Sequence, residues 1–165
     1  MKKTAISKGI FERVSEMNEA FGNPKGDPKN IDWDRLERQC KNILVEFERE
    51  LMPAIAERNL EEVRDALCDI NVFSLGAHHF MGIDADADMH AVIDGVLTRF
   101  IKDERDLAAT MKKYDDLGVD YYLEGTFPTA CLKSLEDQVD KYGESYPKGK
   151  FLKSVSYALT VFPAV

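Results

Sequence analysis

Two rows of carboxylates in residues 43–80 have a spacing that could hold a metal ion. Glu46 and Glu50 stand four residues apart, and Glu62, Asp65 and Asp69 follow at steps of three and four. Residues three or four apart share one face of a helix. Each row would therefore lie along one helix, and a short polar turn between the rows would set the two helices antiparallel.

On each predicted helix, the acidic residues lie next to the apolar residues and not on the opposite face of the helix. Ile43, Phe47 and Ala54 form an apolar stripe, and Glu50 falls in line with it. Charges on a solvent face normally lie opposite such a stripe, and burying a bare charge is costly. Mg²⁺ prefers oxygen ligands and commonly uses a few carboxylates. The same spacing also fits a solvated face with Glu/Arg pairs, and the pattern alone leaves both interpretations open.

Helices must position these carboxylates, and apolar residues at steps of three and four predict five of them. Their predicted ranges are 4–21, 33–52, 60–80, 87–101 and 103–117. Asp32 and Asn59 suit the cap positions of the second and third helices, and Gly82 suits the end of the third. Pro53 should kink or end the second helix near Met52, because proline removes one helical hydrogen bond.

The pattern changes after residue 118. Residues 119–125 and 151–162 have the composition of strands, and the polar run 134–149 predicts turns or a short helix. We therefore predict a mainly α-helical protein with a small C-terminal antiparallel β extension. Residues 1–165 would form a single domain, with a helical body over 1–118 and a mixed β extension over 119–165.

Composition narrows the possible functions. The net charge of −8 argues against a general nucleic-acid binder. The three cysteines are odd in number and contain no CxxC, so neither a zinc knuckle nor a disulfide framework is indicated. The chain has no signal-peptide pattern and no apolar run of membrane-spanning length. We expect no membrane partner and a cytoplasmic location.

Other site patterns fail on particular positions. The acidic stretch 84–88 is not an EF-hand loop, because its sixth and twelfth positions are Met89 and Gly95. No Glu has His three residues later, as a di-iron bundle needs. GxSxG, GxGxxG and the P-loop pattern are absent. Lys148, Lys150 and Lys153 could approach phosphates or could protect an edge strand, and both interpretations stay open.

The order of these features resembles a known family. The run ILVEFERELMPAIAERNLEEVRDALCDINVFSLG resembles the all-α NTP pyrophosphatase superfamily, which includes MazG-like and dUTPase-like enzymes. Residues 83–118 are similar to a later segment of phage and bacterial MazG-like proteins, through Asp94, Arg99 and Phe100 and then Tyr114 and Gly118–Val119. The closing GKFLKS is also similar, so the resemblance covers most of residues 40–155.

Two acidic motifs of that family are altered here. The family's EExxE reads EFERE, with Phe47 in place of the second Glu. Its ExxD, placed to end at Asp69, has Ala66 where Glu is expected, and Asp65 could supply that carboxylate. Placed on Glu62–Asp65, the motif fits but lies one turn early. We therefore favour Glu46, Glu50, Asp65 and Asp69 as metal ligands, with Glu62 in reserve.

The resemblance implies an all-α NTP pyrophosphatase-like helical bundle with a definite chemistry. The expected reaction is Mg²⁺-dependent hydrolysis of a (d)NTP to (d)NMP and pyrophosphate, with Mn²⁺ as a substitute and a homodimer or tetramer as the assembly. Glu46 or Glu50 would act as the base. The alternatives are hydrolysis of another nucleotide, such as an alarmone, and a non-catalytic helical module. The predicted substrate contacts are Asp94, Arg99, Lys102, Lys148, Lys150 and Lys153.

Overall fold

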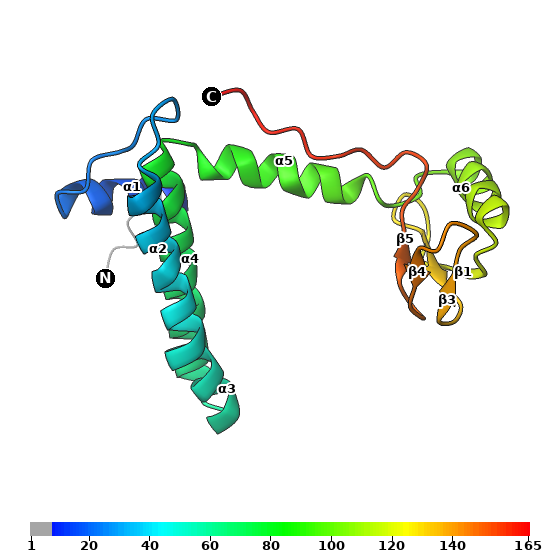
Figure 1. Ribbon diagram of the computed structural model, residues 1–165, viewed down its shortest axis with the longest axis horizontal. Coiled ribbons are helices and arrows are strands. Elements are labelled where there is room, and N and C mark those ends of the chain that lie inside the picture. Colours follow the sequence, from blue (N-terminus) through cyan, green and yellow to red (C-terminus); the bar gives the residue numbers. More distant parts are fainter. Residues whose placement is uncertain (1–7) are drawn as a thin grey trace, which may run out of the picture. The chain divides into compact units, whose positions relative to one another are not determined.

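The computed structural model describes residues 8–165, which are mainly α-helical with short antiparallel strands near the C-terminus (Figure 1). This confirms the predicted fold class. The helical elements are α1 (Ile10–Ala20), α2 (Trp33–Glu46), the π-helix η1 (Phe47–Leu51), α3 (Met52–Glu57), α4 (Leu60–Met81), α5 (Ala85–Leu97) and α6 (Glu104–Leu117). The strands are β1 (Tyr121–Glu124), β2 (Cys131–Ser134), β3 (Gln138–Val139), β4 (Ser145–Tyr146) and β5 (Phe151–Leu152).

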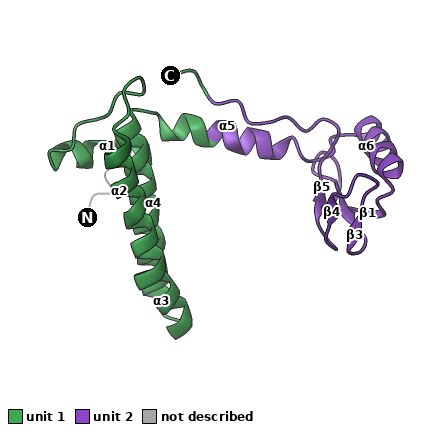
Figure 2. Cartoon of the chain, viewed as in Figure 1, with its two compact units in different colours: residues 1–89, 163–165 green, residues 90–162 purple. Residues whose placement is uncertain are grey.

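The chain divides into two compact units (Figure 2). The first unit ends at Met89 and includes Pro163–Val165, and the second covers His90–Phe162. Helix α6 and residues 90–97 of α5 therefore belong with the strands, and α1 to α4 belong to the first unit. The single domain predicted from the sequence stays a prediction, but its internal boundary at residue 118 differs from this division.

An antiparallel helical hairpin forms most of the first unit. Helix α2, η1 and α3 run one way, and α4 returns beside them. The Asp32 side chain accepts from the Arg35 N–H at 2.9 Å, and the Asn59 side chain accepts from the Glu62 N–H at 3.4 Å. Between the helices Arg58 takes a left-handed conformation, with φ of 56°. The predicted caps and turn are confirmed, and the first predicted helix begins at Ile10, with residues 4–7 outside the described range.

A buried glycine on α4, Gly76, leaves room for a side chain of α2. The Gln39 side chain donates to the Phe73 carbonyl at 3.0 Å. A Cβ atom at position 76 would lie 2.5 Å from the Gln39 Nε2 atom. A larger residue at position 76 would therefore displace the amide that ties α2 to α4.

The π-helix lies just before Pro53. Proline has no N–H to donate, and its ring crowds the carbonyl four residues earlier, which here belongs to Arg49. The wider turn of η1 includes Arg49 and ends at Leu51. Pro53 then occupies the first turn of α3, where the missing N–H costs little. The helical backbone thus continues to Glu57, and the change in hydrogen bonding that Pro53 requires lies in η1.

A fully buried histidine ties α1 and the following loop to α4. The Ser15 hydroxyl lies 2.8 Å from His79 Nδ1, and His79 Nε2 lies 2.9 Å from the Asn23 carbonyl. A neutral ring satisfies both contacts when Nε2 donates to the carbonyl and Nδ1 accepts from the hydroxyl. His79 therefore has a structural role in the first unit.

The second unit packs α6 against a three-stranded antiparallel sheet in the order β1-β2-β5. Tyr121 pairs with Ser134, and Leu132 pairs with Leu152. Strands β3 and β4 form a separate hairpin. The core residues of this unit are Ile101, Tyr114, Val119, Ala130, Leu132, Tyr146 and Leu152.

Two strand predictions were wrong in detail. The hairpin β3–β4 forms inside the polar run 134–149, where turns or a helix were expected, and β5 covers only Phe151–Leu152 of the predicted strand 151–162. The chain leaves the sheet after Leu152 because the Ser154 and Ser156 hydroxyls donate to the buried Asp106 carboxylate at 2.8–3.0 Å. These bonds hold the segment against α6 instead of extending β5.

Candidate metal site

Three carboxylates converge between the two arms of the helical hairpin. Glu46 is the last residue of α2, Glu50 lies in η1, and Asp69 comes from α4. One carboxylate oxygen from each lies within 4.8 Å of the other two. Glu46 and Asp69 are half-buried, and Glu50 is exposed. One cation could therefore contact all three side chains and remain open to solvent on the side of Glu50.

The π-helix lies directly at this cluster. Its backbone hydrogen bonds join residues five apart instead of four apart, so each turn is wider than in an α-helix. Glu46 and Glu50 stand at the start of this wider turn and within it. Single π-turns inside α-helices are frequent at functional sites. The altered turn sets the direction of Glu50 relative to Glu46, which makes η1 part of the site.

The surroundings of the Glu46 carboxylate would favour a bound cation. Its Oε2 atom is buried and has no hydrogen-bond partner within residues 8–165. Burial raises the pKa of Glu46, and the charges of Glu50, Asp69 and Asp65 raise it further. A bound cation would remove this repulsion and give the buried oxygen a partner. The donor set of carboxylate oxygens suits a hard divalent ion, so the residues present fit such an ion.

The remaining predicted acids lie differently. Asp65 is exposed, and its charge is close enough to raise the pKa of Glu46. Glu62 is exposed in the first turn of α4, and it is not part of the three-carboxylate cluster. Ala66 is only 1% exposed, so a glutamate in its place would have to enter a fully packed position on α4. This packing gives a physical reason for alanine at position 66.

Phe47, the other altered motif position, begins the π-helix and is exposed. It therefore fills no part of the core of this chain. An exposed aromatic beside an acidic cluster adds apolar surface to the rim of the site.

The predicted substrate contacts all lie in the second unit. Asp94 is exposed on α5, Arg99 is half-buried after that helix, and Lys102 is exposed before α6. The Nε atom of Arg99 is buried without a partner among the described residues. Lys148 and Lys153 are exposed, and Lys150 is half-buried. The structure thus brings Glu46, Glu50 and Asp69 together, and it places these six residues in a separate unit.

A comparison with family models places the chain. Residues 14–95, which contain α2, η1, α3 and α4, match the model of phosphoribosyl-ATP pyrophosphohydrolase. The chain belongs to the all-α NTP pyrophosphatase superfamily, as the resemblance predicted. It is accordingly a pyrophosphohydrolase, a hydrolase acting on acid anhydrides. No curated protein and no solved structure matches the chain.

The matched segment contains all five predicted acidic residues and ends before Arg99. Everything in the chain after residue 95, including α6 and the strands, lies outside it. No helix of residues 8–165 is long and apolar enough to cross a membrane.

Proposed function

We propose that this protein is a metal-dependent nucleoside triphosphate pyrophosphohydrolase that converts a (d)NTP to a (d)NMP and pyrophosphate. The observation that carries the proposal is the buried, unpartnered oxygen of Glu46 with the carboxylates of Glu50 and Asp69 beside it. The family match supports the general reaction, the cleavage of an acid anhydride by water. The choice of a (d)NTP as substrate is our inference, as is a cytoplasmic location.

Glu46, Glu50 and Asp69 would hold Mg²⁺, or Mn²⁺ as a substitute, with Asp65 as a further ligand and Glu62 in reserve. The bound ion would neutralise phosphate charge and lower the pKa of a water molecule. Glu46 or Glu50 would accept the proton as the water oxygen adds to phosphorus. The exposed position of Glu50 favours it for this role, because solvent reaches it directly. The anhydride bond then breaks, and pyrophosphate leaves with its electron pair.

The family resemblance suggests further residues that would contact the substrate. Arg99 and Lys102 are cations that could bind phosphate oxygens, and Asp94 could accept from a base or sugar. The Lys148, Lys150 and Lys153 side chains are further candidates. These roles follow the family resemblance stated for residues 83–118 and for the closing GKFLKS segment.

Phosphoribosyl-ATP is a second candidate substrate, because the matched family model is named for its hydrolysis. The same anhydride chemistry would serve it. An alarmone nucleotide is a third candidate. Hydrolysis of any of the three would release a phosphate product, so the identity of the substrate has to be measured.

A nucleotide panel tests the proposal. Purified protein with Mg²⁺ or Mn²⁺ is incubated with each canonical (d)NTP, phosphoribosyl-ATP and an alarmone, and pyrophosphate is measured by phosphate release with added pyrophosphatase. We expect hydrolysis of at least one (d)NTP that stops in EDTA. Hydrolysis of phosphoribosyl-ATP alone would move the assignment to that substrate. Failure with every nucleotide and both metals would refute the proposed activity.

Assembly is the companion prediction. No residue of α2 is buried in this chain alone, and large apolar side chains stand exposed on the hairpin, including Trp33 at 68% and Leu60 at 70%. An apolar surface of this kind usually marks an interface. We therefore expect a dimer or tetramer by light scattering at micromolar concentration. A monomer under these conditions would refute the predicted assembly.

A further inference from the structure

A cavity of about 320 Å³ lies in the second unit, wholly outside the segment that matches the family model. It opens between α6, the β3–β4 hairpin and β5. Three lysines line it, Lys113, Lys150 and Lys153, together with the aromatic rings of Tyr114 and Tyr146. A volume near 300 Å³ is at the lower end of the range for small-molecule sites. The lining suggests a small anion as the ligand.

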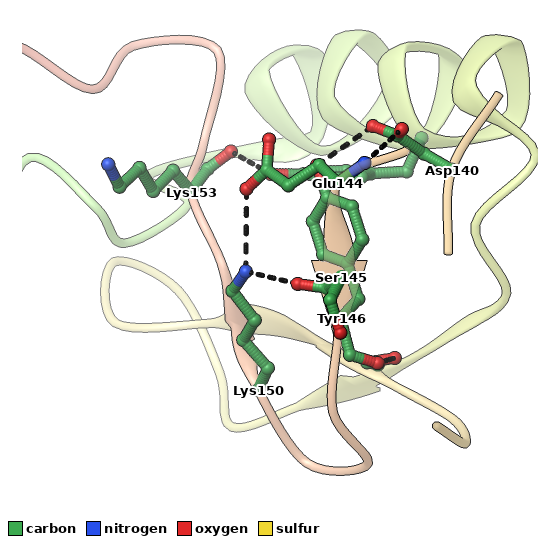
Figure 3. A network of polar contacts seen from close by, with 8 residues as sticks. Asp140, Glu144, Ser145, Tyr146, Lys150 and Lys153 are labelled. Carbon is green, nitrogen blue, oxygen red and sulfur yellow. Dashed lines mark hydrogen bonds and ion pairs between the residues drawn. The ribbon is translucent and has the colours of Figure 1, made fainter. Parts of the chain in front are cut away.

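The two carboxylates of the cavity already have partners. The Asp140 Oδ1 atom accepts from the N–H groups of Tyr142 and Glu144 at 2.8 and 2.9 Å. Burial opposes ionisation of Asp140, but these bonds prevail and lower its pKa. The Glu144 carboxylate lies 3.4 Å from the Lys150 ammonium. Figure 3 shows the Glu144–Lys150 pair and the bonds of Asp140.

Lys113 and Lys153 are left without a carboxylate partner. Within residues 8–165, no carboxylate oxygen lies within 4.0 Å of either ammonium. Burial lowers the pKa of Lys113, the charge of Lys153 lowers it further, and the charge of Glu144 opposes this only in part. Among the described residues, the Lys113 ammonium donates a hydrogen bond to the Lys153 carbonyl at 3.3 Å and lies 4.8 Å from the Tyr114 ring centroid. Lys113 is half-buried and Lys153 is exposed, and two such neighbouring cations are an arrangement that an anion would stabilise.

The aromatic floor of the cavity is fixed and uncharged. Tyr114 and Tyr146 meet edge to face with their centroids 6.2 Å apart, and the Tyr114 hydroxyl donates to the Lys153 carbonyl at 3.1 Å. Burial raises the pKa of Tyr114 to about 12, so its hydroxyl stays protonated and adds no negative charge. The Lys150 ammonium lies 4.3 Å from the Tyr146 ring centroid. The ammonium groups of Lys113 and Lys150 therefore lie near these two rings, and that of Lys153 lies 4.4 Å from the Tyr157 ring centroid.

We propose that this cavity is a second ligand site, which binds a phosphate chain such as pyrophosphate or the tail of a nucleotide without a metal ion. Lys113 and Lys153 would neutralise it, and Lys150 would turn from Glu144 to share it. Lysine is a common phosphate ligand that acts as a point charge. A phosphate chain carries several negative charges in a small volume. It would therefore neutralise three lysines better than a ligand with a single carboxylate group. Lys150 and Lys153 are also candidate substrate contacts of the proposed reaction, but this site would bind a phosphate chain whether or not the acidic cluster is active.

Calorimetric titration of the full chain with pyrophosphate in EDTA tests this inference, because EDTA prevents phosphate binding through a metal at the acidic cluster. We expect saturable binding with one site per chain. Lys113→Gln and Lys153→Gln should each weaken it by about tenfold or more, since each removes a hydrogen bond to a charged group. Lys112→Gln is the matched control: Lys112 is the neighbouring lysine on α6, it is exposed, and it pairs with Asp116. It should change the affinity by less than twofold.

Three outcomes would overturn the inference. One is the absence of pyrophosphate and nucleotide binding by the wild-type protein in EDTA. Another is equal weakening by Lys112→Gln and Lys113→Gln, which would mean diffuse attraction without a site. The third is loss of the signal in Asp69→Asn, which would move binding to the acidic cluster. A titration with dATP shows which part of the ligand is recognised. If dATP and pyrophosphate bind with equal affinity, the site recognises the phosphates alone. If dATP binds more tightly and Lys113→Gln removes this binding too, the site also contacts the nucleoside. Thermal melts of each variant check that the second unit remains folded.

Discussion

Asp69→Asn and Glu50→Gln should each reduce turnover of the preferred nucleotide on the order of a thousandfold. Removing one group that stabilises charge in a transition state typically costs about 10²–10³ in rate, and these two carboxylates lie together with Glu46. Each amide keeps the shape of the side chain and removes its charge. Glu50 is exposed and Asp69 is half-buried, so neither change should prevent folding.

Glu48→Gln is the matched control for this experiment. Glu48 lies in the same π-helix, is exposed, and is not part of the three-carboxylate cluster. Its variant should keep turnover within about twofold, because a surface substitution away from a site usually has a small effect. Steady-state kinetics at saturating Mg²⁺, with circular dichroism to check folding, measures all three variants. If Asp69→Asn retains a rate near that of Glu48→Gln, these acids are not ligands or bases.

Asp65→Asn would show which acid completes the site. Asp65 lies one residue before the position where the family has glutamate, and its charge reaches Glu46. Because it is exposed and outside the closest cluster, its loss should cost less than that of Asp69. The same kinetic series ranks the two directly.

The helical hairpin could be predicted from the sequence because its signals are local. Asp32 and Asn59 cap their helices through bonds to residues three positions later, and such caps can be read from residue type and spacing. The family match then confirmed the superfamily. The convergence of Glu46, Glu50 and Asp69 also follows from two helix periods and one short turn.

Features that depend on distant contacts could not be predicted in this way. The π-helix lies just before Pro53 in an otherwise regular helix, whereas the residue types alone predicted only a kink or an end near Met52. Ala66 is explained by its burial in the folded protein, which no local pattern predicts. The polar strands β3 and β4 have only two residues each, too few to show alternation.

The lysine cavity was missed for the same reason. Sequence analysis identified Lys148, Lys150 and Lys153 as candidates, but Lys113 lies much earlier in the chain, on α6. The fold of the second unit brings Lys113 to the Lys153 carbonyl. The neighbouring Lys112 and Lys113 look alike in the sequence, and only the helix orientation separates the exposed one from the half-buried one.

Addition of Mg²⁺ or Mn²⁺ to EDTA-treated protein should raise its melting temperature by roughly 5–10 °C. An ion that binds only the folded state stabilises it by about 2.7 kcal/mol at a hundredfold excess over its Kd. For a chain of this size, each kcal/mol shifts the melting temperature by about 2–4 °C. Na⁺ at matched ionic strength should give little change, because it cannot draw three carboxylates together as strongly as a divalent ion.

Asp69→Asn should lose most of this metal-induced rise, and Glu48→Gln should keep it. Without metal, Asp69→Asn should melt at or above the wild-type temperature, because one of the charges that repels Glu46 is gone. Differential scanning calorimetry of the three proteins, each with EDTA and then with Mg²⁺, measures both effects. An equal gain by wild type and Asp69→Asn would mean that the acidic rows are a solvated face. The opposite signs expected for Asp69→Asn with and without metal are what separate a ligand from a residue that merely contributes to folding.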